Sequence, residues 1–304
     1  MLVCHKITEL QEAIQAFRAK KSSVPIISVG FVPTMGYLHI GHESLLKKAR
    51  SQNDLVVLSI FVNPLQFGPN EDFDTYPRNT EKDLELAKRA EVDMVFLPTV
   101  EEIYPQYPLA TKITIGDISS RLCGASRPGH FDGVLTIVSK LFHIVQPNQA
   151  YFGQKDIQQV AIIEQMVQDL NMPVQIIACP TVREPDGLAF SSRNVYLEPD
   201  ERSQAVILSK ALKKVDEWLS LPDITVKQLE ERLTLEINLA PLANIEYASI
   251  LAYPALQPLI ANVPIHHAEH SQLNQQVVIA VAVKFGQTRL IDNRIISLGG
   301  ALHA

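Results

Sequence analysis

Cysteine is scarce in this sequence, and its copies lie far apart. The chain of 304 residues contains three, at Cys4, Cys123 and Cys179. This spacing excludes a disulfide framework and a C-x-x-C metal pattern, which need closely or regularly placed cysteines. We therefore expect a protein of a reducing compartment, the cytoplasm.

A surplus of positive charge and long apolar runs are also lacking. Lys and Arg number 27 against 33 Asp and Glu, a formal net charge of -6 at pH 7. This balance disfavours general attraction to nucleic acid or to an anionic membrane. No apolar run approaches the roughly 18 to 20 residues that span a bilayer, and charges interrupt the first segment where a signal peptide needs an apolar core. We expect a soluble protein with small-molecule partners, no nucleic acid and no membrane.

Short β-branched runs alternate with helical patterns in the first part of the chain. The predicted strands cover 26–32, 55–62, 92–97 and 174–178, and the predicted helices cover 8–21, 41–50, 80–90, 132–145 and 156–170. This alternation is typical of α/β proteins with a Rossmann-like, doubly wound parallel sheet. We assign it to a first domain over residues 1–180 that binds nucleotide and acid substrate.

The pattern changes after about residue 180. Predicted helices at 200–219 and 226–238 precede predicted strands at 244–251, 276–284 and 288–296, and the stretch SLPDIT at 220–225 is a predicted loop. We expect a second, smaller, lid-like α+β domain over residues 181–304.

The stretch PTMGYLHIGH, residues 33–42, follows the first predicted strand of the sheet. Ligands of doubly wound sheets lie outside the carboxyl ends of the strands, where helix N-termini favour anions. Gly41 allows close backbone approach, and His39 and His42 can point donors at one group. We favour phosphate contact over two alternatives. One is a zinc site, which would need a third ligand, and the other is a structural role in which His42 caps or packs the helix and His39 faces solvent.

Five motifs together carry a family resemblance. The H-x-G-H element is similar to that of adenylyl-transferring Rossmann enzymes, including class I aminoacyl-tRNA synthetases. The other motifs are SIFVNPLQF at 59–67, ASRPGHFDGV at 125–134, YFGQKDIQQ at 151–159 and DGLAFSSRN at 186–194. In this order, over nearly the whole chain, they resemble the pantothenate synthetase (pantoate-β-alanine ligase) family. The resemblance implies a homodimeric ligase that condenses (R)-pantoate with β-alanine through a pantoyl-adenylate, releasing AMP and pyrophosphate.

Adenylate formation brings the pantoate carboxylate to the α-phosphorus of ATP, so it requires preorganised cations and donors. Chemistry and resemblance together assign catalysis to His39, His42, Lys155, Ser191, Ser192 and Arg193. Lys155 follows the strand-like AYF run and is expected at the same sheet edge as the histidines, the alternative being a solvated surface lysine. The SSR segment suits a loop that closes over triphosphate, the alternative being a turn that joins domains.

ATP is expected as co-substrate, with Mg²⁺ bound mainly through its phosphates and no metal held by the protein alone. By resemblance, the nucleotide-binding positions are Pro33, Thr34, Met35, Gly36, Gly41, Gly153, Asp156, Val182 and Phe190. Phe190 stands where the family usually has Leu or Met. Asp83 is a candidate for a water-mediated magnesium contact, although we favour an ordinary acid in the first turn of a helix.

Neutral amides can satisfy the hydroxyls of pantoate without adding a competing charge. The resemblance assigns substrate binding to Gln66, Gln159 and Asn63, with Arg127 and His130 in supporting roles. Taken singly, each amide is equally typical of a loop or a helix cap. Two positions depart from the family, because Cys123 often has an acidic counterpart and Gln154 often has Glu. Both changes remove a carboxylate near the expected polyanion site.

The stretch IHHAEH at 265–270 falls outside the resemblance. If helical, it would place His266, His267 and His270 where they could bind a metal, but we favour an exposed polar loop. Two other functions remain open from the sequence. One is a different H-x-G-H nucleotidyltransferase, and the other is a nucleotide-binding sensor without turnover.

Overall fold

The computed structural model describes residues 1–20, 27–69, 71–221, 223–267 and 276–298, which form two compact units. The first unit comprises Met1–Ser119, Arg127–Gln154 and Ile162–Val182. The second comprises Ser120–Ser126, Lys155–Ala161 and the residues from Arg183 onward. Two short segments, one of them carrying Lys155, therefore group with the later part of the chain.

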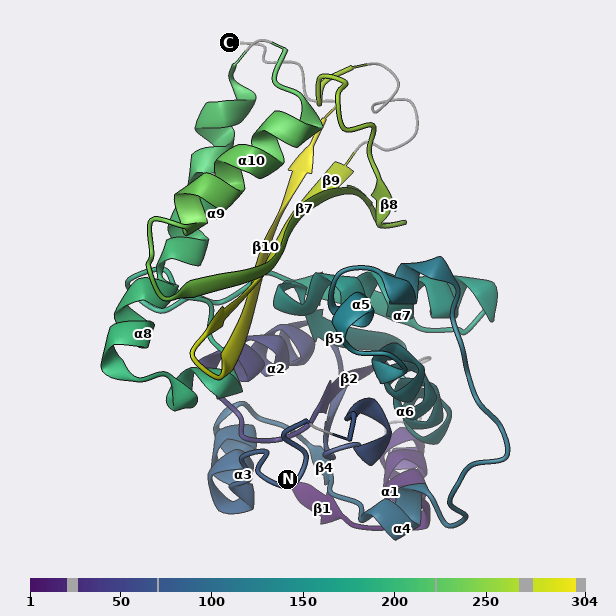
Figure 1. Cartoon of the computed structure of the whole chain (residues 1–304). Coiled ribbons are helices and arrows are strands. Elements are labelled where there is room, and N and C mark those ends of the chain that lie inside the picture. The colour runs from purple at the N-terminus through teal and green to yellow at the C-terminus, as the bar shows by residue number, and fades with distance from the viewer. Residues whose placement is uncertain (21–26, 70, 222, 268–275, 299–304) are drawn as a thin grey trace. The chain divides into compact units, whose positions relative to one another are not determined.

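The first unit contains a six-stranded parallel sheet (Figure 1). Its strands, in spatial order, are β1 (Leu2–Cys4), β4 (Met94–Phe96), β3 (Leu55–Ile60), β2 (Val29–Thr34), β5 (Gln149–Gly153) and β6 (Gln175–Cys179). The predicted α/β fold with a parallel sheet is confirmed. The predicted end of the strand at residue 32 is wrong, because Pro33 and Thr34 continue the pairing of β2 with β3.

Helices connect these strands. The α-helices are α1 (Ile7–Lys20), α2 (Ile40–Gln52), α3 (Thr80–Arg89), α4 (Val100–Ile103), α5 (Cys123–Ser126), α6 (His130–Val145) and α7 (Ile157–Asp169). Three short 3-10 helices are η1 (Pro64–Gln66), η2 (Asp117–Ser120) and η3 (Gln154–Asp156).

Neighbouring residues of β2 show how helices cover both faces of the sheet. Phe31 and Val32 are both fully buried, and they point to opposite faces because side chains alternate along a strand. Val32 packs in a cluster with Leu46 of α2 and Leu86 of α3. Phe31 meets the ring of Phe142 of α6 edge-on, with centroids 6.5 Å apart. Each such buried side chain contributes about 1.5–3 kcal/mol, so packing on both faces holds this strand in the sheet.

The second unit contains an antiparallel sheet with strand order β10 (Thr288–Ser297), β9 (Gln276–Phe285), β7 (Ala243–Tyr253) and β8 (Gln257–Pro258). Its helices are η4 (Ser192–Tyr196), α8 (Pro199–Ala205), α9 (Ile207–Leu219) and α10 (Val226–Ile237). The helices α9 and α10 lie beside this sheet (Figure 1). Alternate residues of β9, such as Ile279 and Val281, share a buried cluster with Leu212 of α9 and Leu229 of α10.

The prediction of one helix over 200–219 is wrong, because the structure has two helices there, α8 and α9. Val206 ends α8, and its backbone N–H bonds to the carbonyl of Gln204 instead of a residue one full helical turn earlier. Among the described residues, no helix is both long and apolar enough to cross a bilayer. The three cysteines are all free and buried.

Candidate active site

The two glycine-containing motifs of the first unit leave the sheet from neighbouring strands. β2 and β5 pair in parallel, with Gly30 opposite Gln149 and Phe31 opposite Ala150. From there the chain proceeds outward to β3 on one side and to β6 on the other, so this pair is the topological switch point of the sheet. PTMGYLHIGH begins at the carboxyl end of β2, and Gly153 ends β5.

A tight turn connects β2 to the first histidine. Thr34 Oγ1 donates to the carbonyl of Ser59 at 2.8 Å and accepts from the N–H of Gly36 at 3.2 Å. Gly36 has a φ of +86°, and a Cβ there would lie 2.9 Å from a methyl carbon of Ile60 and 3.0 Å from a carboxylate oxygen of Asp83. Conformation and space both require glycine at this position.

Asp83, in the first turn of α3, holds the next two residues of the turn. Its carboxylate accepts from the backbone N–H of Tyr37 at 2.9 Å and of Leu38 at 2.6 Å. The residue is 2% exposed, and this burial raises the pKa of Asp83 although the two N–H donors oppose the rise. Asp83 lies in the first turn of a helix, as predicted, but it is buried there and anchors the backbone of the preceding turn.

His39 and His42 cap the start of α2 reciprocally. The Nδ1 atom of His39 accepts from the backbone N–H of Gly41 at 3.1 Å, and the Nδ1 atom of His42 accepts from the N–H of His39 at 3.3 Å. The ring centroids lie 4.1 Å apart. Because each Nδ1 accepts, the proton of each neutral ring is on Nε2. The capping role and the donor role are thus compatible, and both donors belong to the positive end of a helix dipole.

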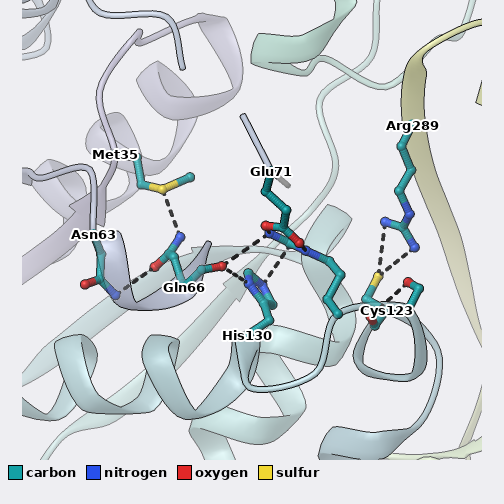
Figure 2. A network of polar contacts seen from close by, with 9 residues as sticks. Met35, Asn63, Gln66, Glu71, Cys123, His130 and Arg289 are labelled. Carbon is teal, nitrogen blue, oxygen red and sulfur yellow. Dashed lines mark hydrogen bonds and ion pairs between the residues drawn. The ribbon is translucent and has the colours of Figure 1, made fainter. Parts of the chain in front are cut away.

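A buried amide pair lies beside the same turn. Asn63 Nδ2 donates to Gln66 Oε1 at 3.2 Å and to the carbonyl of Gly133 at 3.0 Å, and Tyr104 donates its hydroxyl proton to Asn63 Oδ1 at 2.8 Å. Gln66 Nε2 donates to the sulfur of Met35 at 2.9 Å (Figure 2). Burial raises the pKa of Tyr104, so its hydroxyl remains a donor. The structure therefore brings together three predicted residues, Met35, Asn63 and Gln66.

Arg127 and His130 support the backbone of Gln66. Arg127 makes a two-pronged ion pair with Glu71, including a bond of 2.7 Å from Nε to Oε1, and its Nη1 lies 3.1 Å from His130 Nε2. Because a guanidinium only donates, His130 Nε2 accepts, and its Nδ1–H donates to the carbonyl of Gln66 at 2.7 Å (Figure 2). Burial raises the pKa of Glu71, but the hydrogen bonds and charge of Arg127 outweigh it and hold the pKa below its ordinary value. Glu71 was not predicted from the sequence, because no motif distinguishes it.

Lys155 and Gln159 belong to the second unit. The Lys155 side chain is 19% exposed, which disfavours a solvated surface lysine, and its Nζ lies 3.3 Å from Asp156 Oδ2. The carbonyl of Lys155 accepts from Asn293 Nδ2 at 2.9 Å. Gln159 is half-buried in the first turn of α7.

A short hairpin leads to the serine-containing motif. Arg183 and Ala189 form an isolated antiparallel bridge, preceded by the half-buried Val182 and followed by the half-buried Phe190. Arg183 donates to both carboxylate oxygens of Asp292, at 2.6 and 2.9 Å. The hairpin therefore has an anchor 109 positions away in the sequence.

The SSR segment begins the 3-10 helix η4 and is not an open turn. Ser191 Oγ accepts from the backbone N–H of Arg193 at 3.3 Å, and Ser192 is the first residue of η4. Asn194 Nδ2 donates to Glu184 Oε1 at 2.9 Å. Ser191, Ser192 and Arg193 are all half-buried.

Cys123 replaces the expected carboxylate with a buried thiol. Its sulfur lies 3.2 Å from the Tyr247 hydroxyl. Nη2 of Arg289 lies 3.5 Å from the same sulfur (Figure 2). Arg289 forms its ion pair with Glu246 instead, with 2.7 Å between Nε of Arg289 and Oε2 of Glu246. The other departure, Gln154, is half-buried in η3.

The histidine-rich stretch is only partly within the described residues. His266 Nε2 lies 3.4 Å from the carbonyl of Leu219, the N–H of His267 donates to the carbonyl of Pro264, and His270 lies outside the described residues. In the part of the chain that the structure describes, no three His, Cys, Asp or Glu residues are grouped to hold a metal ion.

A cavity of about 250 Å³ adjoins the turn on the Asp83 side. Its lining includes Met35, Gly36, Phe61, Arg78 and Asp83, but none of the six residues assigned to catalysis.

Comparison with known proteins gives one consistent result. The sequence model of the pantoate-beta-alanine ligase family matches residues 2–295. Pantothenate synthetases from Pelotomaculum thermopropionicum and Acetivibrio thermocellus are 49% and 50% identical over 97% and 98% of this chain, and 99% and 100% of those proteins are covered. A crystal structure of pantothenate synthetase from Thermus thermophilus matches with a TM-score of 0.85 and 41% identity, covering 98% of this chain and 99% of that one.

A further crystal structure, pantoate-beta-alanine ligase from Francisella tularensis complexed with beta-gamma ATP and β-alanine, matches with a TM-score of 0.75 and 37% identity, covering 99% of both chains. The matched length, the identity and the fold agree with the motifs and their order. The chain belongs to the pantoate-β-alanine ligase family.

Proposed function

We propose that this ATP-dependent ligase joins (R)-pantoate to β-alanine through a pantoyl-adenylate, using the residues described above. The observation that carries the assignment is the pair of Nε2–H donors of His39 and His42 at the start of α2, beside the switch point of the sheet. A helix N-terminus favours anions, and two additional ring N–H donors there favour binding of a phosphate group.

In the first half-reaction, the pantoate carboxylate attacks the α-phosphorus and pyrophosphate leaves. His39 and His42 donate to phosphate oxygens, Lys155 and Arg193 supply positive charge, and the hydroxyls of Ser191 and Ser192 donate to the same polyanion. Such preorganised groups stabilise the charge that develops in the transition state. Mg²⁺ enters bound mainly through the ATP phosphates.

The remaining nucleotide contacts are proposed from the family motifs. They are Pro33, Thr34, Met35, Gly36, Gly41, Gly153, Asp156, Val182 and Phe190. The positive φ of Gly36 and its packing against Ile60 and Asp83 fix the conformation in which this turn would present its backbone to the nucleotide.

Pantoate binding is proposed for Gln66, Gln159 and Asn63. The buried network around Asn63 and Gln66 supports this role, because amides whose rotamers are already fixed lose less entropy on binding. Arg127 is neutralised by Glu71, so we assign Arg127 and His130 to holding Gln66 and not to direct binding of the substrate carboxylate.

In the second half-reaction, the amine of β-alanine attacks the acyl carbon, a C–N bond forms, and the bond from that carbon to the AMP oxygen breaks. No enzyme nucleophile is needed, so the work of the protein is to position the amine and exclude water. The buried cysteines have no part in this step.

Family resemblance supports three further proposals. The protein is a cytoplasmic enzyme of pantothenate biosynthesis, it forms a homodimer, and its residues 181–304 act as a lid-like domain. Sedimentation at several protein concentrations tests the dimer.

The reaction is tested by measuring pyrophosphate release from ATP and D-pantoate, with and without β-alanine, while AMP and pantothenate are followed by mass spectrometry. We expect sustained release only with both substrates and one AMP per pantothenate. AMP retained on the product would instead indicate another nucleotidyltransferase, and ATP binding without release would indicate a sensor.

A further inference from the structure

Two neighbouring side chains of β10 hold two different segments of the candidate nucleotide site. Asp292, 3% exposed, accepts both guanidinium bonds of Arg183, and Asn293, 8% exposed, donates to the carbonyl of Lys155. All four residues lie in the second unit.

The bond to Arg183 fixes the base of the hairpin that leads to the SSR motif. Besides its pair with Asp292, Arg183 Nη1 donates to the carbonyl of Gly187 at 3.2 Å, and the bridge to Ala189 closes the hairpin. Because Asp292 is almost fully buried, an uncompensated charge there would be costly, so the pairing is strongly enforced. The chain that leaves this hairpin reaches Arg193 four residues after Ala189.

The bond to Lys155 fixes a backbone position. Lysine has a long flexible side chain, so the place that its ammonium group can occupy depends on where its Cα is held. The amide of Asn293 holds the carbonyl of Lys155 directly. β10 itself is rigidly placed, because it pairs with β9 along its whole length, with Asp292 opposite Val281 and Asn293 opposite Ala280.

We propose that Asp292 and Asn293 are positioning residues for adenylate formation, an inference that rests on the proposed function. Because they are attached to consecutive positions of one strand, the Lys155 backbone and the hairpin that leads to Arg193 keep a fixed spacing. The positive side chains of Lys155 and Arg193, which contact the same triphosphate in the proposed reaction, are then already positioned when ATP binds. A displacement of about 1 Å in such an arrangement costs up to about 10² in rate.

The test compares Asn293→Asp with Arg294→Ala. The first variant has nearly the same shape but cannot donate to the Lys155 carbonyl. The second, at the next position of β10, loses bonds to Asp216 and the carbonyl of Leu212, neither of which belongs to the candidate site. The measurements are single-turnover pantoyl-adenylate formation at saturating ATP and pantoate, the rate at which preformed adenylate reacts with β-alanine, and the melting temperature.

We expect Asn293→Asp to slow adenylate formation about 10-fold or more, with a smaller change in the second half-reaction. The rate of adenylate formation by Arg294→Ala should remain within about two-fold of wild type, because this variant loses only a surface ion pair, which contributes little to stability. Equal slowing of both variants, in proportion to lost thermal stability, would overturn the inference. A wild-type rate for soluble Asn293→Asp would also overturn it.

Arg183→Lys serves as a second variant if Asn293→Asp does not fold, because it keeps a charge beside Asp292 but loses the two-pronged geometry. Slowed adenylate formation supports the inference, and a wild-type rate overturns it. Wild-type protein that forms no adenylate at all would refute the proposed function itself, which distinguishes the two failures.

Discussion

The histidine turn of the first unit and the cation-bearing segments of the second are held by contacts of different range. His39 and His42 cap one another across three residues, and the carboxylate of Asp83 anchors the turn before them. Lys155 and Arg183 are held instead by Asn293 and Asp292, 138 and 109 positions away.

The chemistry of the donors explains this difference. Ring and backbone N–H groups at a helix N-terminus are rigid once the helix forms, so local sequence is enough to aim them. Lysine and arginine side chains are long and flexible, so their backbones need support from another element of the fold. Changes in the first region should therefore damage chemistry directly, whereas changes in the supports of the second should act through position.

The largest expected effect separates capping from phosphate donation. His39→Asn keeps a good N-cap acceptor but removes the Nε2 donor. We expect a loss of roughly 10² or more in adenylate formation, the scale of one transition-state donor, with little change in thermal stability. Rapid-quench kinetics and thermal unfolding measure the two quantities.

The control for this variant is His143→Asn, at an exposed position of α6. Near-normal turnover of His39→Asn would show that the histidine only caps the helix. The histidine turn and the cation-bearing segments would then differ in function as well as in the sequence separation of their supporting contacts.

A smaller effect is expected at Asp83, whose carboxylate anchors the turn of the first region. Asp83→Asn offers one acceptor where the carboxylate serves the N–H groups of both Tyr37 and Leu38. One buried donor is then unmatched, which costs about 1–3 kcal/mol. We expect that loss in denaturant unfolding, together with slower adenylate formation, while the matched change Glu81→Gln on the exposed side of α3 has little effect. Full stability of Asp83→Asn would show that the turn needs no anchor.

The smallest effect concerns the Arg127–Glu71 pair. The pKa of Glu71 is held below its ordinary value of 4.5, because the hydrogen bonds and charge of Arg127 outweigh burial, which raises it. As the pH falls, the unfolded chain therefore takes up the proton first. The stability that the pair provides is complete above pH 4.5 and is lost as the pH falls through the folded-state pKa.

Glu71→Gln should accordingly be less stable than wild type by about 1 kcal/mol at pH 7, and the difference should shrink as the pH falls below 4.5. Urea unfolding across this range, with Glu12→Gln as the exposed control, measures it. A difference that grows toward low pH would contradict the ion pair.

The sequence predicted the histidine turn better than the cation-bearing segments, because the first is held mainly by contacts that are local in sequence and the second by contacts between distant residues. The fold, the family and the location of the histidine turn follow from periodicity and contiguous motifs. The strands β1 and β8 were missed because three and two residues carry no periodic pattern. Asp292 and Asn293 could not be identified, because nothing in the local sequence of a strand shows which loop its side chains will reach.

The central claim is that the two regions act in one step, the formation of pantoyl-adenylate. The most direct test is its single-turnover rate, measured without β-alanine for wild type, His42→Ala and Lys155→Ala. We predict that each variant is slower by roughly 10² or more at saturating substrates. A near-normal rate for either variant would contradict the claim.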